Sequence, residues 1–165
     1  MSAATAISPV REPSIRAIGE SAEGVSAIAH RIRTRGSACV RVLGASMFPW
    51  IRSGDLVFVS RIDFDRVRRG QVILFERAGR LIAHRVLRTA SGAAILTKGD
   101  SLDRADAPVR REEFLGRVTR LHRRRKHVDM ESLAQELLGR CVARFSPVSG
   151  LFYRPFRFAK RLFLA

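Results

Sequence analysis

Short apolar runs separated by glycine-centred turns fill the middle of the chain, between residues 38 and 122. The runs are ACVRVLG, DLVFVSRI, QVILFER, RLIAHRVL, GAAILTK and FLGRVTRLH. The turns between them contain Ser53-Gly54-Asp55, Arg69-Gly70, Ala78-Gly79 and Ser91-Gly92. Frequent short strands with such turns favour a compact β domain over strands that alternate with long helices. The segment ERAGRL, which lies between two of the runs, predicts a tight hairpin.

Two flanking regions have a different pattern. Residues 1–37 are rich in Ser, Ala and Arg, and within them GVSAIAHRIRTRG predicts a short helix that ends at Gly36. Residues 123–165 open with a basic run and then predict an amphipathic helix. The apolar residues on one face of that helix are Leu133, Leu137, Leu138, Val142 and Phe145. We therefore expect a flexible or helical N-terminal segment (1–37), a β domain (38–122) and a basic helical tail (123–165).

The charge of the chain adds a class of partner to this organisation. Among 165 residues, Lys and Arg number 31 against 15 Asp and Glu, which gives a formal net charge of +16. Such a surface attracts polyanions and anionic membranes. The aromatic and cationic segment LFYRPFRFAKRLFLA, together with the helix before it (residues 140–165), suits an anionic bilayer surface or the groove of a partner. Nucleic acid is expected to bind only non-specifically.

Neither a membrane span nor a metal site is predicted. No apolar run approaches the roughly 20 residues that cross a bilayer, and no secretory leader opens the chain. Cys39 and Cys141 have no metal-binding or redox spacing, and His30, His122 and His127 have no partner set of ligands. We expect free thiols, no metal, no cofactor, and a location in the cytoplasm or at the inner face of the membrane.

A candidate nucleophile lies in the segment Gly44-Ala45-Ser46-Met47-Phe48-Pro49. A serine in a turn bounded by Gly and Pro can expose its hydroxyl while nearby backbone N–H groups point at one spot, as acyl transfer requires. A serine in a turn is more often a capping residue, so this motif alone is weak.

His84, in the apolar run LIAHRV, is a candidate general base, because imidazole accepts a proton near neutral pH. A lone histidine in such a run is more often a half-buried residue bonded to a backbone carbonyl. The segment Thr97-Lys98-Gly99-Asp100 offers Lys98 as an alternative base, provided that burial lowers its pKa. Asp100 and Asp106 are either turn residues or the carboxylate that orients the imidazole, and the sequence does not decide between the two.

In this order, the motifs Ser-Met-x-Pro, Ser-Gly-Asp, Gly-Gln-Val, His-Arg-Val and Thr-Lys-Gly-Asp resemble the type I signal peptidase family, within the group that includes the self-cleaving repressor peptidases. The likeness covers residues 39–119 and is closest to the branch that uses a Ser–His pair. It implies a coiled, mixed-strand, mainly-β peptidase domain with short flanking helices. Ser46 matches the nucleophile, His84 the base, Asp100 the Asp of the Lys-Gly-Asp motif, and Asp106 a further Asp.

Two departures from the pattern bear on function. The hydroxyl residue often found two positions before the nucleophile is Gly44 here, so the backbone at Gly44 and Ser46 is left to bind the oxyanion. We also expect no membrane anchor of the kind that is usual in signal peptidases. Met47, Phe48 and Pro49 are the expected substrate contacts.

The resemblance implies a serine endopeptidase that cleaves leader-like or signal-like peptides after small residues, without its own membrane span. The alternative is a non-catalytic basic module on the same fold, which binds anionic lipid, nucleic acid or a partner protein.

Overall fold

The computed structural model describes residues 21–90, 93–123, 126–132 and 134–144. The elements in chain order are α1 (Ala22–Arg35), β1 (Ser37–Arg41), β2 (Leu56–Ser60), the 3-10 turn η1 (Phe64–Arg66), β3 (Val72–Arg77), β4 (Arg80–Ala90), β5 (Ala94–Lys98), β6 (Phe114–Arg123) and β7 (Lys126–Asp129). A further helix covers residues 134–144. Each of the six predicted apolar runs forms a strand.

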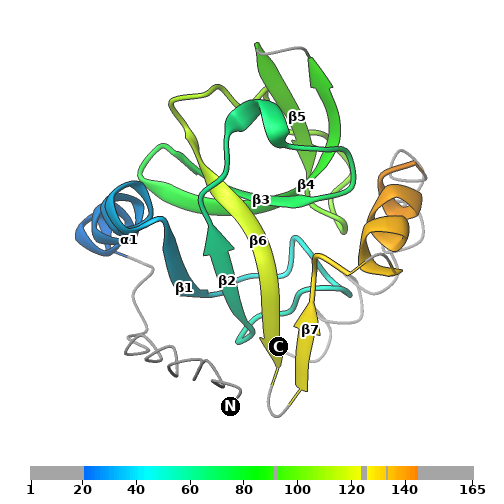
Figure 1. Ribbon diagram of the computed structural model, residues 1–165, viewed down its shortest axis with the longest axis horizontal. Helices are drawn as coiled ribbons and strands as arrows, with labels where there is room; N and C mark the ends of the chain where they lie inside the picture. The colour runs from blue at the N-terminus through cyan, green and yellow to red at the C-terminus, as the bar shows by residue number, and fades with distance from the viewer. Residues whose placement is uncertain (1–20, 91–92, 124–125, 133, 145–165) are drawn as a thin grey trace, which may run out of the picture.

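The strands form one coiled sheet in the order β1-β2-β6-β3-β4-β5, with β7 added beside β6. The long strand β6 crosses the middle of the molecule and joins the part that contains β1 and β2 to the part that contains β3, β4 and β5 (Figure 1). The mainly-β prediction is confirmed. The strand pairs in the described residues are all antiparallel, whereas we expected a mixture of parallel and antiparallel pairs.

The β3–β4 hairpin has a core on each face. Val72 and Leu74 belong to one buried cluster, and Ile73 and Phe75 to a second. Successive side chains of a strand point to opposite faces, and cross-strand partners share a face. The predicted turn at Ala78-Gly79 is confirmed by its left-handed backbone, with φ of 51° and 68°.

The predicted helix that ends at Gly36 is confirmed as α1. The Ser21 hydroxyl accepts a hydrogen bond from the Gly24 N–H at its start, and Gly36 ends it with a φ of 77°. Its apolar face packs against the main cluster through Ile28 and Ile32. The N-terminal segment is therefore part of the domain from residue 21 onward, and residues 1–20 lie outside the described residues.

The C-terminal region differs from the prediction in two ways. Residues 126–129, expected within the helical tail, form β7, because Leu121 of β6 and Val128 pair across a short hairpin. In the helix that follows, Leu137 is 60% exposed, whereas Gly139 and Ala143 are buried, so small residues make the packed face. The expected second amphipathic segment, 151–165, lies outside the described residues. Within the described part of the chain, no helix has the length and apolar character needed to cross a bilayer.

The packed face of the 134–144 helix touches the loop before β3 through backbone atoms. A Cβ on Gly139 would lie 2.5 Å from the Gly70 carbonyl oxygen, and a Cβ on Gly70 would lie 2.6 Å from the Arg140 nitrogen. Gly70 also has a φ of 91°, which disfavours any other residue. These two glycines let the helix approach the sheet more closely than side chains would allow.

This contact predicts that a substitution that favours helix formation will lower the stability of the protein instead of raising it. In a free helix, Gly→Ala stabilises by about 0.5–1 kcal/mol, but Gly139→Ala should destabilise the protein by about 1–3 kcal/mol, because the new methyl group meets backbone atoms. Urea denaturation measures the change. Leu137→Ala, an exposed change in the same helix, is the control and should stay within about 0.5 kcal/mol. A stabilised Gly139→Ala protein would contradict the packing described here.

Candidate active site

Ser46 lies in the turn that follows β1, and two loops hold that turn. The Ser101 N–H donates to the Ser46 carbonyl at 2.9 Å, and the Ser101 hydroxyl donates to the Ala45 carbonyl at 2.7 Å. A Cβ on Gly99 would lie 2.7 Å from the Ser46 carbonyl oxygen, so only glycine fits there. The Lys-Gly-Asp motif thus clamps the backbone of the candidate nucleophile.

The Ser-Gly-Asp motif fixes the far side of the same turn. Asp55 is 4% exposed and accepts hydrogen bonds from the Arg52 N–H at 2.7 Å and from the Arg123 guanidinium at 2.6 and 2.9 Å. Burial acts to raise the pKa of Asp55, but the hydrogen bonds from Arg123 and Arg52 outweigh it, so the net pKa lies below its usual range. Arg123, expected on a basic surface run, therefore closes the turn from β6.

Three residues form a hydrogen-bonded chain beside this turn. His84 Nε2 lies 3.0 Å from the Ser46 Oγ, and His84 Nδ1 lies 2.7 Å from the Asp106 Oδ2. A carboxylate can only accept, so Nδ1 carries the proton and a neutral ring leaves Nε2 to accept from the Ser46 hydroxyl. His84 is 6% exposed and Ser46 is half-buried. This arrangement matches the nucleophile, base and orienting acid of a serine hydrolase.

Two further side chains keep Asp106 in place. The Thr97 hydroxyl donates to the Asp106 Oδ2 at 2.7 Å. Arg77 donates to the carbonyls of Ala107 and Pro108 at 2.9 and 3.0 Å and pairs with Glu113. Burial acts to raise the pKa of Asp106, but the hydrogen bonds from His84 and Thr97 outweigh it, and the net pKa lies below its usual range. Asp106 is therefore ionised when it faces the ring.

Asp100 does not share this role. Both of its carboxylate oxygens accept from the Arg85 guanidinium at 2.8 Å, and the pair is buried, with Arg85 4% and Asp100 2% exposed. Arg85 also donates to the Gly70 carbonyl at 2.9 Å. The sequence left Asp100 and Asp106 open as the orienting acid; the structure places Asp106 on the ring and Asp100 in a structural ion pair.

Lys98, the alternative base, lies on the other face of the sheet from His84. It pairs with Arg85 across β4 and β5, so these two side chains share the face opposite His84. Lys98 is 3% exposed and donates to the Leu102 carbonyl at 2.8 Å. Burial lowers its pKa, while Asp100 and Asp103 act to raise it. The Ser46 hydroxyl makes its hydrogen bond to His84 Nε2 at 3.0 Å.

The residues that we expected to bind the oxyanion and the substrate differ in their exposure to solvent. No acceptor in the described part of the chain takes the Ser46 N–H, which leaves it available to a developing oxyanion. Gly44 adopts a φ of 90°, which only glycine favours, and so shapes the entry to the turn. Met47 is 3% exposed and belongs to the core, whereas Phe48 and Pro49 are partly exposed beside the nucleophile.

The described residues contain no cluster of three or more His, Cys, Asp or Glu side chains that could hold a metal ion. Cys39 and Cys141 are free thiols, as predicted, and burial raises the pKa of Cys39.

Comparison with known families agrees with this geometry. The family described as Peptidase S24-like matches residues 14–119, well over half of the 165-residue chain. The chain belongs to this family. No curated protein matches it in a sequence comparison. The likeness to the wider group of signal and repressor peptidases is thus confirmed at the level of this S24-like domain, and the Ser–His signal peptidase branch stays a prediction.

Sequence reasoning missed four side chains that position the site of this S24-like domain: Arg77, Arg85, Thr97 and Ser101. Arg85 and Thr97 were inside the quoted His-Arg-Val and Thr-Lys-Gly-Asp motifs, so their place beside the candidate catalytic residues was a usable signal. Arg77 had none, because its bonds to Ala107 and Pro108 join segments that only the folded sheet brings together.

The two aspartates are expected to respond differently to substitution by asparagine. Asp100→Asn leaves a buried arginine without its counter-charge and should lower the free energy of unfolding by about 3 kcal/mol. Asp106→Asn keeps hydrogen-bonding capacity beside a half-open site and should cost about 1 kcal/mol. Urea denaturation measures both values. Equal losses would contradict the separate roles assigned to them.

The Arg77–Glu113 pair predicts a defined pH dependence of stability. The hydrogen bond from Arg77 is the main cause that lowers the pKa of Glu113 from 4.5 to about 2. Because the folded-state pKa is depressed, the stabilisation is complete above the unfolded value and is lost as the pH falls toward 2. Glu113→Gln should therefore lower the free energy of unfolding by about 1–2 kcal/mol near pH 6, because water partly screens the pair, and by almost nothing near pH 2.

Denaturation at several pH values measures this difference. Glu112→Gln, a change at the exposed neighbouring residue, is the control and should stay within about 0.5 kcal/mol throughout. A penalty for Glu113→Gln that persists unchanged at pH 2 would refute the assignment.

Proposed function

We propose that this chain is a serine endopeptidase that uses Ser46 as nucleophile, His84 as general base and Asp106 as the acid that orients the ring. The observation that carries the proposal is the continuous hydrogen-bonded chain from Ser46 through His84 to Asp106, at 3.0 and 2.7 Å. A buried histidine that bonds only to backbone would not need an ionised carboxylate on one nitrogen and a half-buried hydroxyl on the other.

The reaction follows from these contacts. The Ser46 Oγ attacks the peptide carbonyl carbon while its proton passes to His84 Nε2, and Asp106 stabilises the resulting imidazolium without taking a proton. The His84 proton then moves to the leaving amine as the C–N bond breaks, which leaves an acyl ester on Ser46. Water, deprotonated by His84, hydrolyses the ester and restores the serine. No cofactor takes part in these steps.

The developing oxyanion requires donors that are not already used. The Ser46 N–H supplies one, and the clamps from Gly99, Ser101 and Asp55 hold the turn so that this N–H does not reorient during the reaction. Preorganised donors stabilise charge without a reorganisation cost, which supports catalysis despite the missing hydroxyl at Gly44.

The proposed substrate is an extended leader-like or signal-like peptide with small residues before the scissile bond. The signal peptidase resemblance suggests this class. The position of Ser46, five residues after the end strand β1, supports it, because an extended peptide can add to a strand edge. Phe48 and Pro49 are the partly exposed side chains next to the nucleophile and would contact that peptide. An anionic membrane surface near residues 140–165 is the proposed working location.

The test compares protein N-termini by mass spectrometry in cells that express the wild type or Ser46→Ala at equal abundance. Ser53→Ala, a change at an exposed serine in the same region, is the matched control. We expect N-termini preceded by small residues in the wild type and the control but not in Ser46→Ala. Identical N-termini in all strains would favour the non-catalytic binding module instead.

With a substrate identified, Asp106→Asn should lower kcat about 10³–10⁴-fold, whereas Lys98→Ala should retain much of the activity.

A further inference from the structure

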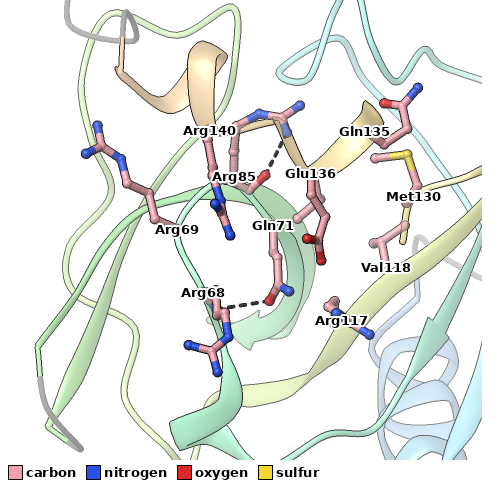
Figure 2. Close-up of a pocket in the computed structure, with 12 residues that line it drawn as sticks. Arg68, Arg69, Gln71, Arg85, Arg117, Val118, Met130, Gln135, Glu136 and Arg140 are labelled. Atoms are coloured by element: carbon pink, nitrogen blue, oxygen red, sulfur yellow. Dashed lines mark hydrogen bonds between the residues drawn. The ribbon is translucent and has the colours of Figure 1, made fainter. Parts of the chain in front are cut away.

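An open cleft of about 600 Å³ lies away from the candidate catalytic triad, between the loop before β3 and the helix 134–144. The lining side chains that matter here are Arg68, Arg69, Thr89, Arg140, Cys141 and Arg144. Figure 2 shows the adjoining small cavity, around which Arg68 and Arg69 from the loop and Arg140 from the helix are arranged. The two walls thus bring arginines from distant parts of the sequence to one place.

The arginines of this cleft lack counter-charges. Among the described residues, no carboxylate lies within ion-pair distance of Arg68, Arg69, Arg140 or Arg144. The one acid on the cleft wall, Asp65, is held by Arg111 at 2.9 Å, and Glu136 lines the adjoining cavity. Guanidinium groups gathered around one hollow repel each other, and a bound anion would relieve that repulsion.

The two walls of the cleft are joined by contacts other than ion pairs. The backbone contact between Gly70 and Gly139 sets the distance between the walls, and the Arg69 guanidinium donates to the Ala143 carbonyl at 3.2 Å. Arg85 donates to the Gly70 carbonyl at 2.9 Å. The loop and the helix therefore fix the backbone positions from which these arginines extend, which favours a binding site over a diffuse charged surface.

The arginine and threonine side chains of the cleft favour a phosphate group as ligand. Guanidinium forks pair with the oxygens of phosphate in a bidentate geometry, and the Thr89 hydroxyl adds a neutral donor. We propose that this cleft binds a phosphate-bearing anion, either the headgroup of an anionic phospholipid or a soluble phosphate compound. The cleft holds no candidate catalytic residue, so this site is independent of the proposed peptidase activity.

Cys141 provides a local readout of occupancy. It is an exposed thiol on the cleft wall, whereas Cys39 is a half-buried thiol on β1. The experiment alkylates the full chain with neutral iodoacetamide, at constant ionic strength, and follows each cysteine by peptide mass spectrometry. The probes are inorganic phosphate, glycerol 3-phosphate, and vesicles of phosphatidylcholine with or without phosphatidylglycerol. We expect saturable slowing at Cys141 and an unchanged rate at Cys39.

A charge-matched pair of variants separates the cleft from the overall positive field of the protein. Arg68→Gln with Arg144→Gln removes one arginine from each wall and should raise the half-protecting concentration about tenfold. Arg35→Gln with Arg80→Gln removes the same charge at exposed positions outside the cleft and should change it less than about twofold.

The arms of the experiment distinguish the two sources of phosphate. Protection by inorganic phosphate or glycerol 3-phosphate supports a soluble ligand, and protection only by vesicles that contain phosphatidylglycerol supports a lipid headgroup. Three results would overturn the proposal: no protection of Cys141 by any probe, equal weakening in both double variants, or protection only by an added single-stranded oligonucleotide. The last result would indicate a groove for nucleic acid instead.

Discussion

The buried ion pair between Arg85 and Asp100 is the interaction on which the arrangement of this domain depends. It joins the strand that carries His84 to the loop that clamps Ser46, so the candidate base and the candidate nucleophile are set relative to each other through one charge pair. Both charges are buried, and each is tolerable only because the other is present. The same guanidinium reaches Gly70 and so ties the C-terminal helix to the site as well.

Two separate parts of the chain restrain the turn at Ser46, the loop after β5 and the segment before β2, and they use three kinds of contact. Gly99 excludes a side chain, Ser101 supplies hydrogen bonds, and Asp55 binds a guanidinium from β6. Since these contacts come from the end of β5 and, through Arg123, from β6, the candidate nucleophile is held in place only after these strands have joined the sheet. A peptidase built in this way would gain its activity late in folding, when its own partly folded chain is no longer an available substrate.

The strands, the hairpin at Ala78-Gly79 and the helix before Gly36 were predictable because each depends on local periodicity and turn chemistry. Ser46, His84 and Asp106 were also predictable as candidates, from ordered motifs. The sequence did not assign Asp100, because an aspartate after a strand looks the same whether it faces a ring or an arginine. It placed residues 126–129 in a helix, since four residues are too few to show a strand period against a basic background. Arg77 and the glycine contact at residue 139 depend on tertiary proximity alone.

His84 and Arg85 are neighbours in sequence but serve opposite faces of β4: one faces Ser46 and Asp106, the other Asp100. The candidate chemistry therefore depends on His84 and the architecture on Arg85, two adjacent residues that have no side-chain partner in common. A substitution at position 84 changes the candidate chemistry but leaves the Arg85–Asp100 ion pair in place, whereas a substitution at position 85 leaves Asp100 buried without its counter-charge. An engineer who seeks a new reaction on this scaffold can vary the first of these two residues and should leave the second unchanged.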